Sequence, residues 1–129
     1  MREMIHETLS NSETYIMKVI WSGEEDISVM ELVDGLRERY DKDYQRSTIA
    51  TFLIRLASKG FVSTYKKKKY AYVHAEVSEA EYKTYIAQNE TDFWFSGRPS
   101  EYFAALCSSK ELTKDEIERI RGMLDGMDH

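Results

Sequence analysis

Cationic side chains gather in one stretch of this sequence, between Tyr44 and Ala75. The stretch contains seven Lys or Arg residues and no Asp or Glu, so it carries +7, whereas the whole chain carries −5 and the remainder therefore −12. Such segregation creates a local positive field on an acidic protein, which favours binding to phosphate groups. Taken alone, it is equally compatible with a solvated basic hairpin. The basic residues are Arg46, Arg55, Lys59, Lys66, Lys67, Lys68 and Lys69.

Enzyme chemistry finds little support in the sequence. The histidines, His6, His74 and His129, are far apart and show no metal-ligand spacing. The sequence has no glycine-rich phosphate loop and no Gly-x-Ser-x-Gly nucleophile motif. Acidic pairs such as Asp115-Glu116 stand at expected helix starts, where the helix dipole explains them without catalysis. We therefore expect no enzyme activity, no metal site and no cofactor.

The composition also bears on the compartment. The first residues include acids and lack a long apolar stretch, so we expect no signal peptide. No apolar run approaches the roughly 20 residues that span a bilayer, so no membrane insertion is expected. The single Cys107 cannot form an intrachain disulfide. These features predict a cytoplasmic protein.

Capping boxes mark four helix starts. In each, a Ser or Thr is followed three residues later by a Glu, so that each side chain can bond to a free backbone N–H of the other residue. The pairs are Ser10/Glu13, Ser28/Glu31, Ser78/Glu81 and Thr113/Glu116. Apolar residues at helical spacing, and Pro99 at another helix start, complete the pattern. We predict helices over residues 12–21, 29–40, 46–58, 79–93, 99–108 and 114–127.

A basic β-hairpin is expected after the third helix. Gly60 is suited to the left-handed C-terminal cap of that helix. Residues 61–65 and 70–73 have the Tyr and Val enrichment of strands, with residues 66–69 as the turn. The order helix, connector, helix, turn, helix, hairpin within about 65 residues is typical of a winged helix-turn-helix.

The helix over residues 46–58 has two distinct faces. Its apolar stripe, expected to be buried, consists of Ile49, Phe52, Leu53 and Leu56. The other face carries short hydroxyl groups and cations, which can reach phosphates and base edges when a helix lies in the major groove. We therefore predict DNA contacts by Arg46, Ser47, Thr48, Thr51, Arg55 and Lys59 on this helix and by Lys66, Lys67, Lys68 and Lys69 on the wing.

Four segments resemble the BlaI/MecI/CopY penicillinase-repressor family. Residues 12–21, Ser-Glu-Thr-Tyr-Ile-Met-Lys-Val-Ile-Trp, resemble its opening helix, a Glu followed by Met-x-Val-(Ile/Leu)-Trp. Residues 48–60 are similar to its recognition helix, Thr-(Ile/Val)-x-Thr-x-Leu-x-Arg-Leu-x-x-Lys-Gly. Residues 65–73 resemble its wing, and residues 112–117 resemble the segment before its last helix. The resemblance covers about residues 10–127.

The resemblance implies a mainly α fold with a small β-hairpin, in which a winged-helix DNA-binding domain (residues 1–76) precedes a helical dimerisation domain (residues 77–129). It implies a homodimeric repressor on double-stranded palindromic operator DNA, relieved through cleavage of the dimerisation domain by a membrane-bound sensor protease. The last helix has apolar residues spaced 3, 4 and 3 apart, as in a coiled-coil seam. The expected dimerisation residues are Tyr102, Phe103, Leu106, Ile117, Ile120, Leu124 and Met127.

The sequence departs from the family pattern in three places. Arg46-Ser47-Thr48 replaces a common Pro-Lys-Thr, so a different operator preference is expected. Cys107 is alone, whereas the copper-responsive members carry several cysteines, and we expect it to be a small packed thiol. The Asn-Phe pair that is usually cleaved is replaced, in ungapped register, by Ala105-Leu106.

Two alternatives remain open on the sequence. One is a winged-helix protein–protein interaction module without DNA affinity, which suits the acidic tail. The other is a ligand-responsive winged-helix regulator of the multiple-antibiotic-resistance-repressor type, which differs in the trigger for release.

Overall fold

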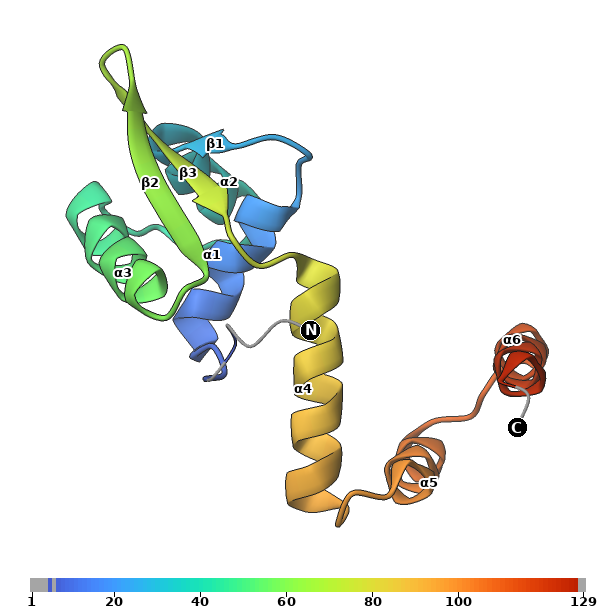
Figure 1. The fold of residues 1–129 in the computed structure, drawn as a ribbon. Helices are drawn as coiled ribbons and strands as arrows, with labels where there is room; N and C mark the ends of the chain where they lie inside the picture. The colour runs from blue at the N-terminus through green and yellow to red at the C-terminus, as the bar shows by residue number, and fades with distance from the viewer. Residues whose placement is uncertain (1–4, 6, 128–129) are drawn as a thin grey trace. The chain divides into compact units, whose positions relative to one another are not determined.

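A computed structural model describes Ile5 and residues 7–127; His6 and His129 lie outside the described residues. The chain divides into two compact units, residues 1–86 and 87–129. The elements of the first unit are α1 (Asn11–Trp21), β1 (Ile27–Ser28), α2 (Val29–Tyr40), α3 (Arg46–Ser58), β2 (Val62–Lys67), β3 (Tyr70–Ala75) and the start of α4 (Glu79–Trp94) (Figure 1). The helix bounds lie within one residue of the predicted ones, and those of β2 and β3 within two; β1 was not predicted.

The capping boxes start the helices as predicted. Ser10 Oγ accepts the Glu13 N–H at 3.3 Å, and Glu13 Oε1 accepts the Ser10 N–H at 2.8 Å. Reciprocal pairs also form at Ser28/Glu31 and Ser78/Glu81. At the last helix, only the forward bond, from the Glu116 N–H to Thr113 Oγ1, is made.

The end of α3 is a complete Schellman motif. The Gly60 N–H donates to the Ala57 carbonyl, and the Phe61 N–H donates to the Leu56 carbonyl. Gly60 has a φ of 87°, which glycine adopts without the steric penalty of a Cβ. The predicted left-handed cap at Gly60 is confirmed, and it directs the chain from α3 into the wing.

The β-structure is a sheet of three antiparallel strands in the order β1-β3-β2, rather than the two-stranded hairpin that was expected. β1 pairs Ile27 with Val73 and Ser28 with Tyr72. The sequence indicates only a connector between the first two helices, because a strand of two residues shows no periodicity. Pairing with β3, more than 40 residues later, makes it a strand.

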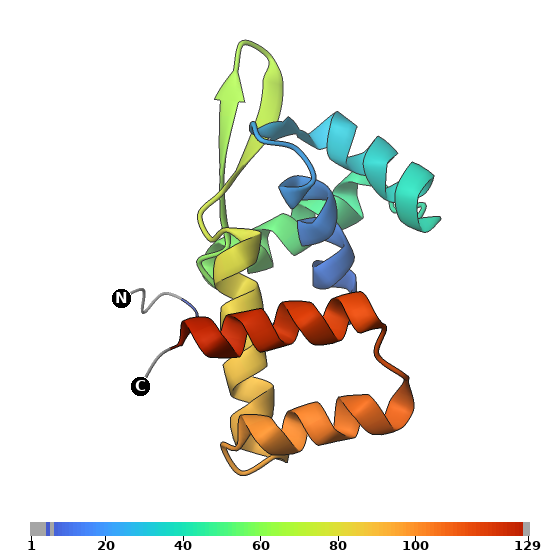
Figure 2. The ribbon, with the colours of Figure 1, turned by 90° about the vertical axis from the view of Figure 1, so that its right-hand side faces the viewer.

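The wing is longer and its turn tighter than predicted. β2 continues through Lys66 and Lys67, and Lys67 pairs with Tyr70, so Lys68 and Lys69 alone form the turn. Lys68 has a φ of 61°, which lets two residues reverse the chain. The tip extends beyond the helices (Figure 2).

The core of the first unit joins α1, α2 and α3 to the sheet. It is built from fully buried side chains such as Ile16, Leu32, Ile49 and Phe61. Gly35 allows close packing of α2 on α1, because a Cβ there would lie 2.7 Å from Val19 Cγ1.

The first turns of α4 also belong to this core. Tyr82 is buried, and its hydroxyl accepts the Leu9 N–H at 2.8 Å. Trp21 Nε1 donates to the carbonyl of Val77, which is itself buried. Residues beyond 76 therefore stabilise the winged-helix unit, whereas the division into DNA-binding and dimerisation domains at residue 76 stays a prediction.

The second unit comprises the end of α4 with α5 (Pro99–Ser109) and α6 (Lys114–Gly126). Neither α5 nor α6 contains a buried residue among those the structure describes. Cys107 is exposed, so the expectation of a packed thiol is wrong for the single chain, because none of the described elements covers this face of α5. Throughout the described part of the chain, every helix falls short of the length and apolarity needed to cross a bilayer.

Candidate nucleic-acid interface

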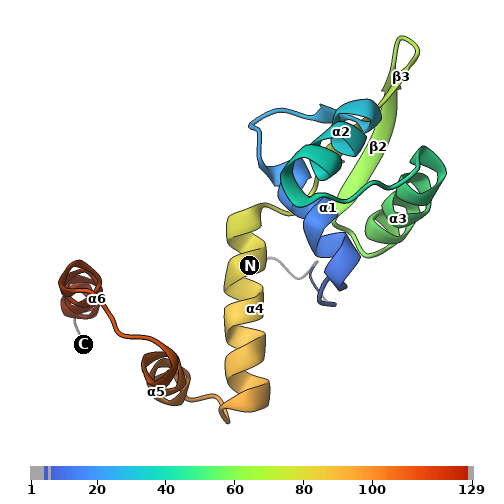
Figure 3. The same ribbon diagram turned by 180° about the vertical axis from the view of Figure 1, so that it is seen from behind.

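The two faces of α3 are separated as predicted. Ile49, Leu53 and Leu56 are buried and attach α3 to the core, while Phe52 is half-buried. The predicted DNA-contacting residues of α3, apart from Lys59, are all exposed: Arg46, Ser47, Thr48, Thr51 and Arg55. α3 lies beside the wing in views from opposite sides (Figures 1 and 3).

The start of α3 is suited to an anion. Its N-cap, Gln45, makes no side-chain capping bond, and the first turn contains no acidic residue. The first N–H groups of a helix have no partner within the helix, and the macrodipole places partial positive charge there. Together with the Arg46 side chain, this end of α3 offers donors and charge to a phosphate.

Side chains along α3 differ in how they are held. The Thr51 hydroxyl donates to the Ser47 carbonyl at 3.2 Å, so its lone pairs remain able to accept. The Arg55 guanidinium lies over the Phe52 ring, 5.5 Å from its centroid. This contact restricts a long side chain and lowers the entropic cost of holding it against a partner.

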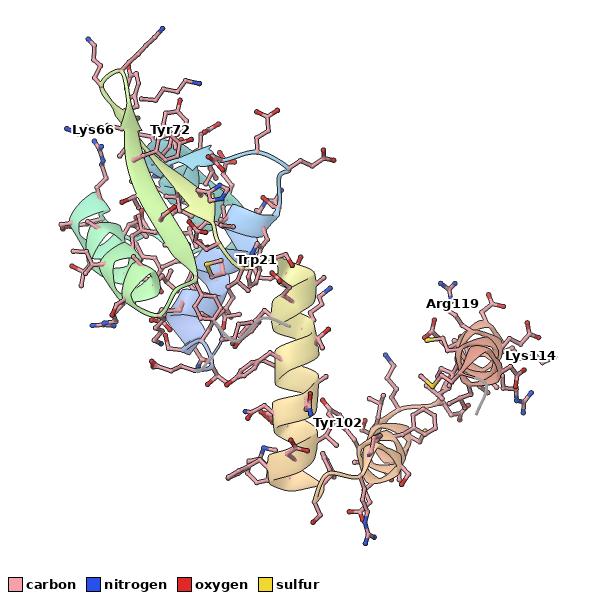
Figure 4. All side chains as sticks on the ribbon, in the orientation of Figure 1. Trp21, Lys66, Tyr72, Tyr102, Lys114 and Arg119 are labelled. Carbon is pink, nitrogen blue, oxygen red and sulfur yellow. The ribbon has the colours of Figure 1, made fainter. Side chains whose placement is uncertain are left out.

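The wing carries its charge at the end of β2 and in the turn that follows. Lys66 and Lys67 lie at the end of β2, and Lys68 and Lys69 in the turn, all exposed. Figure 4 shows Lys66 and Tyr72 on the hairpin. Tyr72 stacks on Tyr65 at 5.7 Å between centroids, which stiffens the base of the wing below the lysines.

A groove of about 630 Å³ lies between α3 and the wing. α3 contributes Arg46, Ser47, Ala50 and Ile54, and the wing contributes residues of β2 and β3. Ala50 and Ile54 are not among the residues predicted from the sequence to contact DNA, which are all polar or charged. The sequence does contain an indication of an exposed Ile54, because this apolar residue does not fall on the buried stripe of Ile49, Leu53 and Leu56.

Lys59 lies apart from the other cations of this region. Its Nζ is 2.7 Å from Oε1 of Glu13, whose side chain is 1% exposed, while that of Lys59 is 19% exposed. Burial alone would raise the pKa of Glu13, but hydrogen bonds from Lys59 and Ser10 outweigh it and lower the pKa. Because the Lys59 ammonium group is already engaged in this pair, Lys59 is not among the residues proposed to contact DNA.

A second polar cluster joins Asp26, the residue just before β1, to the wing. Asp26 Oδ2 accepts the Tyr65 hydroxyl at 2.6 Å, and Asp26 Oδ1 lies 2.8 Å from Nδ1 of His74. The hydrogen bond from Tyr65, and to a smaller extent the contact with His74, lower the pKa of Asp26. The hydrogen bond with Asp26 in turn raises the pKa of His74. The cluster ties the base of the wing to the chain before β1, and no motif in the sequence indicated it.

We expect His74 to titrate above its ordinary value near 6.5. Because its pKa is raised in the folded chain, the stability from this pair is present below pH 6.5 and is lost as the pH rises through the folded pKa. An NMR titration of the His74 ring measures the midpoint. In Asp26→Asn the midpoint should fall; an unchanged midpoint would show that Asp26 does not hold the proton on His74.

The predicted dimerisation residues carry apolar surface. Tyr102, Phe103 and Leu106 of α5 are exposed, and Tyr102 stacks on Phe95 at 4.9 Å between centroids. On α6 and at its C-cap, Ile117 and Ile120 are half-buried, and Leu124 and Met127 are exposed. The possible cleavage pair, Ala105-Leu106, lies inside α5.

The chain is similar in sequence to known proteins. Residues 9–126 match the penicillinase repressor family. The chain is 26% identical over 117 residues to the methicillin resistance regulatory protein MecI of Staphylococcus aureus (strain N315), covering 91% of this chain and 93% of that protein. It is also 26% identical over 117 residues to the penicillinase repressor of Staphylococcus aureus, covering 91% and 90%.

Among solved structures, the chain is similar to the DNA-binding domain of the repressor BlaI. The TM-score is 0.50 at 27% identity, over 64% of this chain and 94% of that domain. This likeness confirms the predicted winged-helix fold. Because the family match spans both compact units, almost from end to end, the chain belongs to the penicillinase repressor family.

Proposed function

We propose that this chain is a cytoplasmic, DNA-binding transcriptional repressor that acts as a homodimer on a palindromic operator. The observation that carries the proposal is the surface formed by α3 and the wing, where exposed cations and hydroxyl groups occur without any acid between Tyr44 and Ala75. The family of the chain and its likeness to the BlaI DNA-binding domain support the same activity.

In the proposed complex, α3 occupies the major groove and the wing lies along the neighbouring backbone. Thr48, Thr51 and Arg55 contact base edges or phosphates, and Arg46 and Ser47 bind a phosphate at the start of α3. The lysines of the wing neutralise further phosphates. A dimer bound over a promoter prevents the polymerase from occupying it.

The dimer is proposed on the apolar surface of α5 and α6. Leu124 is 62% exposed in the single chain, and no described residue of either helix is buried. An isologous interface built from these helices would remove this surface from water. It would also present two recognition helices, as two operator half-sites require.

The test is selection from a random pool of duplex DNA by the full chain. We expect enrichment of a palindromic sequence that the chain then binds in a gel shift, well above its affinity for unselected duplex. Failure to enrich any sequence would favour the protein–protein interaction module instead.

The wing is expected to set the salt dependence of binding. Replacing both Lys66 and Lys69 with Gln should flatten the slope of log affinity against log salt by about one to two units, since each lost phosphate contact removes about 0.9. These two substitutions leave Lys68, the residue with positive φ in the turn, unchanged. Fluorescence anisotropy over a series of salt concentrations measures the slope, and an unchanged slope would remove the wing from the phosphate contacts.

Arg55 is expected to contribute to sequence discrimination. If Arg55 contacts a base, Arg55→Ala should reduce the preference for the selected duplex over random duplex by about 1–3 kcal/mol. Lys42→Ala, which removes a cation lying over the Tyr15 ring, is the control and should retain the preference. Equal weakening on both duplexes would assign Arg55 to a phosphate instead.

Relief of repression is proposed to involve the second unit. Cleavage within α5, at or near Ala105-Leu106, would divide the dimerisation surface, and the exposure of α5 supports access by a protease. Incubation with a membrane-bound sensor protease, followed by mass spectrometry, tests this route. Release without a cut, on addition of a small molecule, would favour the ligand-responsive alternative.

A further inference from the structure

The groove between α3 and the wing is apolar although it lies on the cationic face. Its lining includes Ala50, Ile54 and Ala57 of α3, Thr64 of β2 and Ala71 of β3. The charge among its described lining residues comes from Arg46. Hydrogen-bonding and charged groups alone therefore do not account for what this surface recognises.

Ile54 is the most exposed of the large apolar side chains on α3. It is 72% exposed, and it lies seven residues after Ser47 and four after Ala50, on the face that points away from the core. A singly exposed apolar residue is common in proteins. Here, however, the side chain borders an apolar groove in the middle of the proposed recognition helix, where a partner would bury it.

The charge around the groove indicates what that partner is. Every Asp, Glu, Lys or Arg position between Tyr44 and Ala75 is basic, and these residues stand on α3, at its C-cap, at the end of β2 and in the wing turn. A protein partner seated here would have to be strongly acidic along its whole contact. Duplex DNA meets the requirement, and the C5-methyl group of thymine is the apolar group that projects into its major groove.

We propose that Ile54, with Ala50 beside it, reads thymine methyl groups in the operator. The inference rests on the proposed function and specifies part of its recognition chemistry. Ile54 suits the task because a β-branched side chain in a helix has one strongly preferred χ1 rotamer, so less side-chain freedom is lost when it meets the methyl group. Ala50 is small enough to let the edge of the base approach.

The experiment uses the duplex that the full chain selects from a random pool. Each thymine is replaced in turn by deoxyuridine, which lacks the methyl group and keeps the same hydrogen-bonding groups. We expect one or two positions at which binding weakens about fourfold, the effect of losing one buried methyl contact. Fluorescence anisotropy of the full chain on each duplex gives the affinities.

Variants at residue 54 then test whether the Ile54 side chain makes the contact with the methyl group. Ile54→Ala should bind the thymine duplex about fourfold or more weakly and should no longer distinguish uracil from thymine at those positions. Ile54→Leu keeps the apolar surface and should still distinguish them. Because Ile54 is mostly exposed, both variants should retain the thermal unfolding midpoint of the parent chain, which is the control for folding.

Two outcomes overturn the inference and are distinguishable. If the selected duplex binds but the uracil series is flat, or if Ile54→Ala keeps the sensitivity to uracil, the methyl contact is wrong and the DNA-binding function stands. If the chain enriches no duplex at all, the proposed function fails together with it.

Discussion

Replacing Lys59 with methionine is expected to destabilise the first unit by about 3 kcal/mol, near the lower end of the range for a broken buried ion pair. Glu13 is almost completely buried, and Lys59 Nζ lies 2.7 Å from its Oε1. The change removes the cation and leaves the buried carboxylate with the hydrogen bond from the Ser10 N–H. Because Lys59 itself retains some exposure, the larger losses seen for fully buried pairs are not expected.

The pH dependence of the Lys59→Met variant should be opposite to that of the parent chain. In the parent, the pKa of Glu13 is lowered, so the stability from the pair is present above the ordinary value of 4.5 and is lost as the pH falls. Without Lys59, burial dominates and should raise the pKa of Glu13. Its contribution is then fully present below pH 4.5 and is lost as the pH rises.

Urea unfolding at several pH values, at one fixed protein concentration, measures both effects. Lys18→Met is the matched control, since Lys18 pairs with Glu79 at the surface and should contribute less than about 1 kcal/mol. Equal losses in the two variants would contradict the assignment of Lys59 to a buried pair. A variant with the same pH dependence as the parent would do so as well.

Leu124→Glu is expected to separate the proposed dimer and to weaken binding to a full palindromic duplex by about 100-fold. The substitution places a carboxylate in the apolar seam that Ile117, Ile120, Leu124 and Met127 form along α6. Burial of that charge opposite its symmetry mate would cost more than a marginal helical interface supplies. Binding to a single half-site should be unchanged, because the first unit is not altered.

Sedimentation equilibrium gives the oligomeric state, and anisotropy on full-site and half-site duplexes gives the affinities. Arg119→Gln on α6, which is not one of the seam residues, changes the net charge by the same amount, and it should leave the dimer intact. Arg119 is exposed on α6 (Figure 4). A dimeric Leu124→Glu chain, or equal weakening on both duplexes, would remove α6 from the proposed interface.

The features that the sequence predicted well are set by nearby residues. A capping box is a contact between residues three apart, and the Gly60 cap depends on a single residue that tolerates positive φ. The spacing of Ile49, Leu53 and Leu56 likewise defines a face of α3 without knowledge of what covers it. The helix bounds, the separation of the faces of α3 and the position of the wing followed from such local signals.

What the sequence by itself determined, then, is the order of the elements and the segregation of positive charge onto α3 and the wing. The tertiary structure decided the contacts between residues far apart: β1 against β3, Lys59 against Glu13, and Asp26 against Tyr65 and His74. It also formed the apolar groove beside Ile54 from residues of α2, α3, β2 and β3. These contacts depend on which elements pack together, and a side chain's local spacing carries no information about a partner that only folding brings within reach.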